Sequence, residues 1–286
     1  RTPGSRMFIE VGTRVKIDDL LMGMVVQSGN DASVALAEHI AGTEGVFAQM
    51  MNQHAQQLGM LSSKFLNATG LPAEGHVTTA RDLATLARAL ISEFPDYYAR
   101  LSTKEFTYND IKQNTRNSLL WRDPSVDGMK TGHTDDAGYC LVSSAKRDGM
   151  RVISVVLGTS STRSRTDGSQ ALINYGFRFF ETRLLYKAGE EITTARVWQS
   201  EKITSRLGVL EDLYITVPRG SYEKLESTVD IPAIVEAPIA AGQPVAELKI
   251  SLGAEQLLST QLRALDENPV GSFWQQTKDS ISLWFE

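Results

Sequence analysis

The sequence contains very little cysteine: among its 286 residues only Cys140 carries a thiol. A single cysteine excludes an internal disulfide. Because Cys140 lies in the apolar run 139–142, we expect it to be a buried strand residue rather than a reactive thiolate. Long apolar runs are also absent. No stretch of about 18 apolar residues occurs, so the sequence predicts no segment that spans a bilayer.

An excess of basic residues is absent as well. The chain has 29 Lys and Arg against 34 Asp and Glu, a formal net charge of −5. Without a basic run to contact phosphates, we predict no nucleic-acid partner. The spacing HExxH is also missing, and His39 and His54 fall on different predicted helices, so we predict no metal site. The 42% of hydrophobic residues is sufficient for a sizeable core, and the length suggests about two domains.

The first part of the chain has helical periodicity. The apolar spacing predicts helices over 17–27, 31–41 and 44–59, followed by a loop over 61–77. Thr79 is a candidate N-cap for a further helix that begins there, with Asp82 three residues later.

The pattern changes to strands from residue 105. Segments 105–108 and 117–121 are predicted as strands, and Asp148-Gly149 is a favoured hairpin turn between two β-branched arms. A helix over 165–181 closes this part. Helices, an antiparallel sheet and a closing helix indicate an α+β domain, which we place at residues 1–186.

A second region consists of short alternating strands. The segments TARVW, DLYITVPRG, ESTVDIPAI, PVAELKISL and LSTQLRAL are separated by Gly and Pro. This spacing predicts a small all-β domain at residues 187–267.

Residues 268–286 form a third segment with helical spacing of large apolar side chains. These are Val270, Phe273, Trp274, Ile281, Trp284 and Phe285. One interpretation is a helix that packs on a soluble core. We favour an amphipathic helix that lies in the headgroup region of a membrane, because aromatic side chains dominate one face.

Ser28-Gly29-Asn30 is the first motif that carries chemistry. The Ser28 hydroxyl could relay a proton if a basic group lies beside it. The Asn30 carboxamide offers a donor and an acceptor, which suits holding a peptide amide. The alternative is an N-cap cluster in front of the helix over 31–41.

Lys130-Thr131-Gly132 is the second motif, about a hundred residues later. An ammonium and a hydroxyl at these positions can bind a carboxylate, and Gly132 permits close approach of a substrate. The backbone N–H of His133 could donate to an oxyanion. The alternative is an ordinary turn at the start of a strand. Together the two motifs match two of three signature elements of penicillin-binding proteins and class A β-lactamases.

From Met7 to its end the chain resembles the D-alanyl-D-alanine carboxypeptidases, the low-molecular-mass penicillin-binding proteins of the bacterial periplasm. The segments that carry the resemblance are LMGMVVQSGNDASVALAEHIAG, FLNATGL, TTARDLATLARAL, NSLLWRDPSVDGMKTGHTDDAGYCLVSSA, GFRFFET and ITVPRG. The resemblance implies a β-lactamase/transpeptidase-like domain with an all-helical half, an appended β domain and a C-terminal amphipathic helix.

The resemblance also implies an activity: a serine peptidase removes the terminal D-alanine of peptidoglycan stem pentapeptides through an acyl-enzyme. It implies no metal and no organic cofactor, and inhibition by β-lactam antibiotics. The protein would be periplasmic and peripheral on the inner membrane, held to the membrane surface by its C-terminal helix.

The resemblance assigns roles to individual residues. Ser28 would pass a proton to the leaving amine, and Asn30 would hold the substrate amide. Lys130 would supply positive potential and, with Thr131 and Thr134, receive the terminal carboxylate.

Three more residues join this site by the same resemblance. His133 would lend its backbone N–H, and Arg165 would take part in recognising the carboxylate. Arg116 matches a position of structural ion pairing. An ordinary surface arginine is the alternative for Arg165.

The chain departs from the family's pattern in one element. The nucleophilic serine and its lysine base form a Ser-x-x-Lys motif several tens of residues before Ser-x-Asn, whereas only 27 residues precede Ser28 here. Ser143…Lys146 and Ser221…Lys224 match the spacing, but both fall in predicted β regions. Because the chain opens in a loop-like segment without methionine, we expect residues upstream.

Three hypotheses follow. The first is a DD-carboxypeptidase whose 286-residue chain, taken alone, is inactive because it lacks the nucleophile. The second is a non-catalytic peptidoglycan-binding or scaffold protein. The third, a β-lactamase, shares the motifs but not the β domain and the tail.

Overall fold

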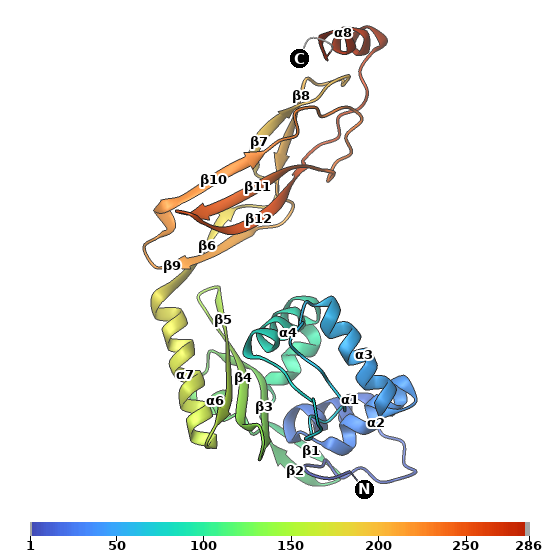
Figure 1. The fold of residues 1–286 in the computed structure, drawn as a ribbon, viewed down its shortest axis with the longest axis vertical. Helices are drawn as coiled ribbons and strands as arrows, with labels where there is room; N and C mark the ends of the chain where they lie inside the picture. Colours follow the sequence, from blue (N-terminus) through green and yellow to red (C-terminus); the bar gives the residue numbers. More distant parts are fainter. Residues whose placement is uncertain (1, 284–286) are drawn as a thin grey trace. The chain divides into compact units, whose positions relative to one another are not determined.

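The computed structural model describes residues 2–283, with side chains up to residue 281. The chain divides into two compact units, Arg1–Arg178 (unit 1) and Phe179–Glu286 (unit 2). Figure 1 shows helices and a sheet in unit 1 and mostly strands in unit 2. The boundary that we predicted after residue 186 lies beyond β6 (Phe180–Tyr186), a strand that pairs with β9 (Leu213–Pro218) in unit 2.

Unit 1 begins with a helical half. Its elements are α1 (Ile17–Met22), the π-helix η1 (Gly23–Gln27), α2 (Asn30–Ala41), α3 (Glu44–Gln57), α4 (Ala80–Glu93), α5 (Pro95–Tyr98) and the 3-10 helix η2 (Ala99–Ser102). The predicted cap at Thr79 is confirmed, because its side chain accepts a hydrogen bond from the Asp82 N–H over 3.1 Å. The helix predicted over 17–27 changes to a π-helix at Gly23. A Cβ there would lie 2.2 Å from Met7 Sδ, so the fully buried Met7 occupies the space beside this turn.

Strands and a closing helix complete unit 1. They are β1 (Glu105–Tyr108), β2 (Ile111–Asn114), α6 (Leu119–Arg122), β3 (Val126–Thr134), β4 (Gly138–Arg147), β5 (Met150–Thr159) and α7 (Thr162–Phe179). The strand predicted over 117–121 is wrong. The Asn117 side chain accepts from the Leu119 N–H, and one helical turn buries both Leu119 and Leu120 in the core.

The sheet of unit 1 has the order β3-β4-β5, and all its pairs are antiparallel. The predicted hairpin is confirmed: Asp148 and Gly149 both have positive φ, 48° and 83°, as a two-residue turn of this kind requires. Cys140 lies on β4, as expected, but it is half-buried rather than buried.

Helices cover both faces of this sheet (Figure 1). On one face Leu141 and Ala145 pack against Ile173 of α7. On the other face Met129 packs with Ala87 of α4 and Leu101 of η2. Burial on both faces explains the nearly continuous apolar runs of β4 and β5. It also holds β3, and with it the Lys130 motif, against the helical half.

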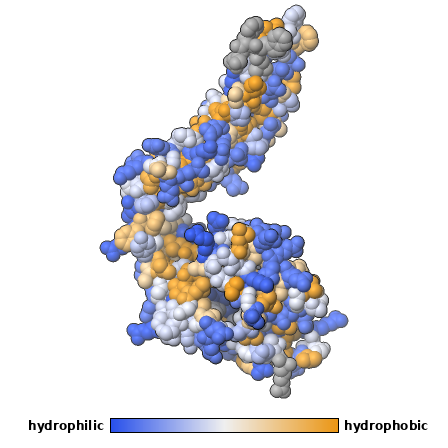
Figure 2. Space-filling model, viewed as in Figure 1, coloured by the Kyte–Doolittle hydropathy of each residue, from blue (hydrophilic) through white to orange (hydrophobic). Residues whose placement is uncertain are grey.

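Within the described residues both outer strands of the sheet, β3 and β5, have a free edge. Figure 2 shows apolar surface on unit 1 where β5 and α7 lie. The exposed fractions of Leu157 on β5, 36%, and Leu172 on α7, 45%, agree with this view. Apolar side chains of these two elements are therefore not fully covered by the described residues.

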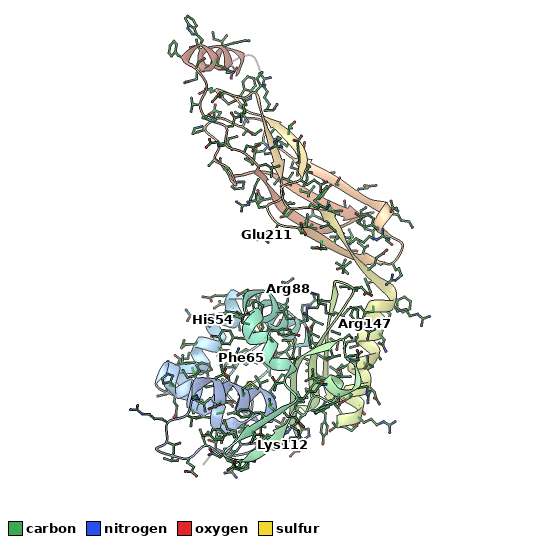
Figure 3. The ribbon with its side chains drawn as sticks, turned by 180° about the vertical axis from the view of Figure 1, so that it is seen from behind. His54, Phe65, Arg88, Lys112, Arg147 and Glu211 are labelled. Carbon is green, nitrogen blue, oxygen red and sulfur yellow. The ribbon has the colours of Figure 1, made fainter. Side chains whose placement is uncertain are left out.

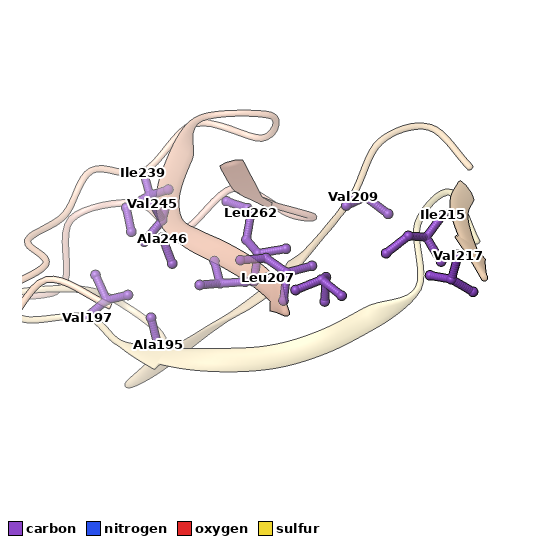
Figure 4. Close-up of a cluster of buried hydrophobic side chains, with 13 residues drawn as sticks. Ala195, Val197, Leu207, Val209, Ile215, Val217, Ile239, Val245, Ala246 and Leu262 are labelled. Atoms are coloured by element: carbon purple, nitrogen blue, oxygen red, sulfur yellow. The ribbon is translucent and has the colours of Figure 1, made fainter. Parts of the chain in front are cut away.

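Unit 2 is built of β6, β7 (Glu191–Arg196), β8 (Thr204–Gly208), β9, the 3-10 helix η3 (Tyr222–Lys224), β10 (Leu225–Asp230), β11 (Pro244–Leu252) and β12 (Glu255–Ala264). Its five-stranded sheet has the order β10-β11-β12-β8-β7, and β6 pairs with β9. Figure 4 shows its core, which includes Leu207, Val217, Leu262 and Ile239. The predicted all-β character is confirmed, although the sequence analysis did not predict β6 and β8.

The chain continues into α8 (Phe273–Leu283). The Asp279 carboxylate accepts a hydrogen bond from the Gln199 N–H over 2.8 Å, which ties this helix to unit 2. Phe273, Trp274 and Ile281 are 75%, 80% and 59% exposed. Trp284 and Phe285, which we also placed on this helix, lie outside the described residues. No helix in the described range is both long and apolar enough to cross a membrane.

Candidate active site

Ser28 occupies the turn between η1 and α2. It has left-handed backbone angles, φ 62° and ψ 39°, and the Gly23 carbonyl accepts hydrogen bonds from the N–H groups of Ser28 and Gly29. A left-handed non-glycine residue is uncommon and costs free energy. Its side chain does not cap α2. The N-cap alternative for Ser28 is therefore wrong, and the hydroxyl is available for another contact.

That contact is with Lys130. Lys130 Nζ donates to Ser28 Oγ over 2.8 Å and to the Thr131 carbonyl over 3.0 Å. The two side chains are 102 residues apart in the sequence. They meet because β3 packs beside the helical turn that carries Ser28. The structure thus brings the two sequence motifs into one place.

The environment of Lys130 is unfavourable for a charge. Burial, reinforced by the positive charges of Arg116 and Arg165, lowers the pKa of Lys130 from 10.5 to about 8. No ion pair to Lys130 occurs among the described residues. A lysine in such surroundings exchanges its proton readily near neutral pH and attracts anions.

Arg165 is the second cation at this place. It is 4% exposed, and its guanidinium donates to the Gly132 and Arg116 carbonyls over 3.3 Å each. Within the described range its Nε has no hydrogen-bond partner, and no carboxylate pairs with its guanidinium. The ordinary surface-arginine alternative is therefore wrong: burial lowers the pKa of Arg165 and leaves an unneutralised charge beside Gly132.

Arg116 adds a third positive charge near Lys130. Its Nη1 donates to Ser5 Oγ over 2.8 Å, and it makes no ion pair with any described carboxylate. The expectation of structural ion pairing at this position therefore stays a prediction. Three cations that pair with no carboxylate of the described residues form an environment that favours binding of a carboxylate.

Asn30 and its neighbour hold the N-terminal segment in place. Asn30 is 7% exposed, and its Nδ2 donates to the Pro3 carbonyl over 2.8 Å. The Asp31 carboxylate accepts from the N–H groups of Met7, Phe8 and Ile9 over 2.9, 2.9 and 3.2 Å. The Asn30 side-chain oxygen has no partner within the described range and so remains the acceptor of this motif. Sequence reasoning did not identify Asp31.

The residues after Lys130 differ in what they contact. Thr131 Oγ1 has no hydrogen-bond partner in the described part of the chain, whereas Thr134 Oγ1 accepts from the Ala137 N–H over 3.0 Å. Among the described residues, a Cβ at Gly132 would meet only the Cys140 side chain, at 3.7 Å. The exposed His133 ring lies 3.9 Å from that of Tyr139. The glycine is therefore not required by packing within the chain and leaves β3 open to a ligand there.

A pocket of about 660 Å³ adjoins the end of β3. Thr134, Asp136 and Ala137 line it on one side, and Phe65, Leu71, Glu74 and His76 on the other. Figure 3 shows Phe65 and His54 in the helical half and Arg147 beside α7. The sequence marked 61–77 only as a loop and did not reveal this pocket. A similar hollow of about 680 Å³ lies near Asn52 and Ser63, and neither hollow includes Ser28 or Lys130.

A polar cluster supports β3 on the side of the helical half. The Tyr98 hydroxyl donates to Asp127 Oδ1 over 2.5 Å, and Arg151 donates to Asp127 and to Ser144 Oγ. Burial, followed by the Asp127 hydrogen bond, raises the pKa of Tyr98 well above its usual range. This cluster fixes the strand three residues before Lys130, and no sequence motif pointed to it.

The described residues contain no group of three His, Cys, Asp or Glu side chains placed to hold a metal. His39 lies on α2 and His54 on α3. His76 packs edge-on against Phe65, and burial lowers its pKa.

The chain matches two family models, D-alanyl-D-alanine carboxypeptidase over residues 1–161 and Penicillin-binding protein 5, C-terminal domain, over residues 180–269. It is 39% identical over 283 residues to the D-alanyl-D-alanine carboxypeptidase DacA of Escherichia coli (strain K12), which covers 98% of this chain and 70% of that relative. It belongs to the D-alanyl-D-alanine carboxypeptidase family.

Solved structures agree with this membership. Penicillin binding protein 5 from Haemophilus influenzae superposes with a TM-score of 0.83 at 39% identity, over 93% of this chain and 78% of that one. Penicillin-Binding Protein D2 from Listeria monocytogenes, in the ampicillin-bound form, superposes with a TM-score of 0.57 at 35% identity, over 62% of this chain and 74% of that one. The predicted fold class, a β-lactamase/transpeptidase-like domain followed by an all-β domain, is confirmed.

The two Ser-x-x-Lys matches lie on β4 and at η3, and neither begins on a helix of the helical half. Ser143 is fully buried on β4, where it shares a hydrogen bond with Ser154 Oγ over 2.9 Å. Ser221 and Lys224 flank the turn of η3 in unit 2. Ser143 lies opposite Met129 in the β3–β4 pair, but its buried hydroxyl is hydrogen-bonded to Ser154, and Ser221 belongs to unit 2.

Proposed function

We propose that unit 1 binds the terminal D-alanyl-D-alanine of a peptidoglycan stem peptide beside Ser28 and Lys130. The natural protein that contains this chain then removes the last D-alanine through an acyl-enzyme on a serine. The observation that carries this proposal is the 2.8 Å contact between Lys130 Nζ and Ser28 Oγ, which joins the two motifs. The family membership supports it.

The charges of the site suit the substrate. The terminal carboxylate would bind Lys130, the free Thr131 hydroxyl and the nearby Arg165, whose charge has no carboxylate partner among the described residues. The backbone beside Gly132 would take the peptide along the open edge of β3, with the His133 N–H directed to the oxyanion. Ser28 would pass a proton to the leaving amine, and Lys130, which is hydrogen-bonded to Ser28, would supply a proton to Ser28 in turn.

β-Lactam antibiotics are proposed to bind the same place, because they also present a carboxylate next to a reactive carbonyl. The ampicillin-bound form of the Listeria relative supports this proposal.

Labelling with a fluorescent penicillin tests the activity. We expect the natural protein that contains this chain to form a stable adduct with the penicillin. The 286-residue chain has no Ser-x-x-Lys before Ser28, so we expect it to form no adduct and to leave D-alanyl-D-alanine peptides intact. Intact-mass measurement detects the penicillin adduct on either protein. An adduct on the 286-residue chain would contradict the placement of the nucleophile, and no adduct on the folded natural protein would contradict the function.

One observation favours a second candidate, a non-catalytic protein that binds peptidoglycan. The sequence holds no Ser-x-x-Lys before Ser28, and its two matches elsewhere lie in β4 and at η3. If the natural protein has a mass near the 31.5 kDa of this chain, this candidate is favoured.

We further propose that the protein is periplasmic and lies on the inner membrane through α8. At about 3.6 residues per turn, Trp274 and Ile281 lie on one side of the helix and Asp279 on the opposite side. Because Asp279 is bonded to Gln199, the exposed Phe273, Trp274 and Ile281 point away from that contact. Such a face suits the interfacial region of a bilayer.

Vesicle binding tests this anchor. We expect F273S/W274S to lower the partition of the chain onto phosphatidylcholine–phosphatidylglycerol vesicles at least tenfold, because each aromatic side chain contributes about 2 kcal/mol on burial. Cosedimentation measures the bound fraction. The matched control is L210S, which alters a 50% exposed leucine elsewhere in unit 2. Equal losses in both variants would refute a specific membrane face.

A further inference from the structure

We propose that Ser28 and Lys130 form a serine–lysine pair in which Ser28 Oγ is itself a nucleophile toward small, uncharged activated esters. This activity is separate from the carboxypeptidase reaction, where the nucleophile is another serine. It would give the 286-residue chain a slow esterase activity of its own.

The geometry meets the requirement for an activated serine. A hydroxyl becomes a nucleophile when a base lies within hydrogen-bond distance, and Lys130 Nζ lies 2.8 Å from Ser28 Oγ. The other hydrogen bond of Nζ goes to the Thr131 carbonyl, so a fixed acceptor holds the amine in place. Ser28 is half-buried, so its hydroxyl keeps some contact with solvent.

The electrostatic surroundings favour the neutral amine. No carboxylate in the described range pairs with Lys130, and the charges that act on it, Arg116 and Arg165, are positive. The pKa of Lys130, lowered to about 8, leaves roughly a tenth of the amine unprotonated at pH 7. The same cations would stabilise the negative charge that develops on the ester oxygen.

The reaction balances without a cofactor. Ser28 Oγ attacks the ester carbonyl carbon as its proton moves to Lys130 Nζ. The Oγ–C bond forms, the bond to the leaving alcohol breaks, and Nζ returns the proton to that alcohol. A water molecule then gives a proton to Nζ and attacks the acyl group, which leaves as a carboxylic acid while Ser28 recovers its proton.

A bound carboxylate should suppress this activity. An anion beside Lys130 favours the ammonium form, which cannot act as a base. Penicillins and D-alanyl-D-alanine peptides carry such a carboxylate, so an uncharged ester is the appropriate probe. N-acetyl-D-alanine should inhibit the esterase, which links this inference to the carboxylate site proposed above while leaving the two separately testable.

The experiment uses the 286-residue chain with p-nitrophenyl acetate and a fluorophosphonate. We expect at least a tenfold loss of p-nitrophenol release in S28G and in K130R. Glycine adopts the positive φ of position 28 readily, so S28G should fold, and arginine keeps the charge but does not release its proton. S160G, at an exposed serine of unit 1, is the control and should retain the rate within about twofold.

Mass spectrometry locates the adduct. We expect one phosphonyl group on the peptide that contains Ser28, and a rate that rises with pH around a midpoint near 8. An adduct on another residue, or an unchanged rate in K130R, would overturn the inference. Failure of N-acetyl-D-alanine to inhibit an otherwise active esterase would count against the proposed carboxylate site, not against the serine–lysine pair.

Discussion

The variant D31N is expected to destabilise unit 1 by about 3 kcal/mol. Asp31 accepts hydrogen bonds from the N–H groups of Met7, Phe8 and Ile9. Asparagine has nearly the same shape, but one of its two acceptors becomes an NH₂ group that faces backbone donors. Hydrogen bonds to a charged group contribute about 1.5–3 kcal/mol each, so loss of one or two of them gives this magnitude.

Urea unfolding and amide hydrogen exchange measure the effect. Cys140 is the only cysteine and lies in unit 1, so pulse labelling of its thiol in urea, above the labelling of the folded chain without urea, reports unfolding of this unit alone. We expect the amides of Met7, Phe8 and Ile9 to exchange fastest in D31N, since their acceptor is changed. D135N, which alters an exposed aspartate of the turn after β3, is the matched control. Equal stability of D31N and D135N would show that the carboxylate does not hold the N-terminal segment.

Local sequence signals predicted the elements that depend on neighbouring residues. Thr79 with Asp82, and Asp148 with Gly149, act within a few positions, and both occur as predicted. The strand predicted over 117–121 failed because burial of two consecutive leucines against the sheet overrides a short apolar run. The π-helix η1 depends on Met7, which fills the space beside Gly23 from another part of the chain.

In the candidate site, too, features set by neighbouring residues were predicted, and features set by distant contacts were not. The Ser28 and Lys130 motifs were visible because their residue types and glycines are distinctive. The supporting contacts were not: Asp31 bonds to residues more than twenty positions earlier, and Tyr98 bonds to Asp127, 29 positions later. Such pairs carry no local spacing. The positive environment of Lys130 likewise arises only when folding brings Arg116 and Arg165 near it.

Replacing Lys130 should stabilise the protein at neutral pH and destabilise it at high pH. The pKa of Lys130 is about 8 in the folded chain against an ordinary 10.5. Below pH 8 the folded state bears the full cost of burying the proton, about 3 kcal/mol. That cost falls as pH rises from 8 to 10.5, because the folded chain loses the proton first, and it vanishes above 10.5.

K130M therefore separates stability from function. It relieves the cost of the buried charge but gives up two hydrogen bonds, worth about 1 kcal/mol each. We expect K130M to be about 1 kcal/mol more stable than the unsubstituted chain at pH 7 and about 2 kcal/mol less stable at pH 10.5. Urea unfolding with a short iodoacetamide pulse at Cys140 measures both values, and K146M, on an exposed lysine of β4, is the control. A difference that does not change sign between the two pH values would contradict the lowered pKa. If it does change sign, the unpaired ammonium is retained at a cost to stability, as expected of a group kept for its action on a ligand.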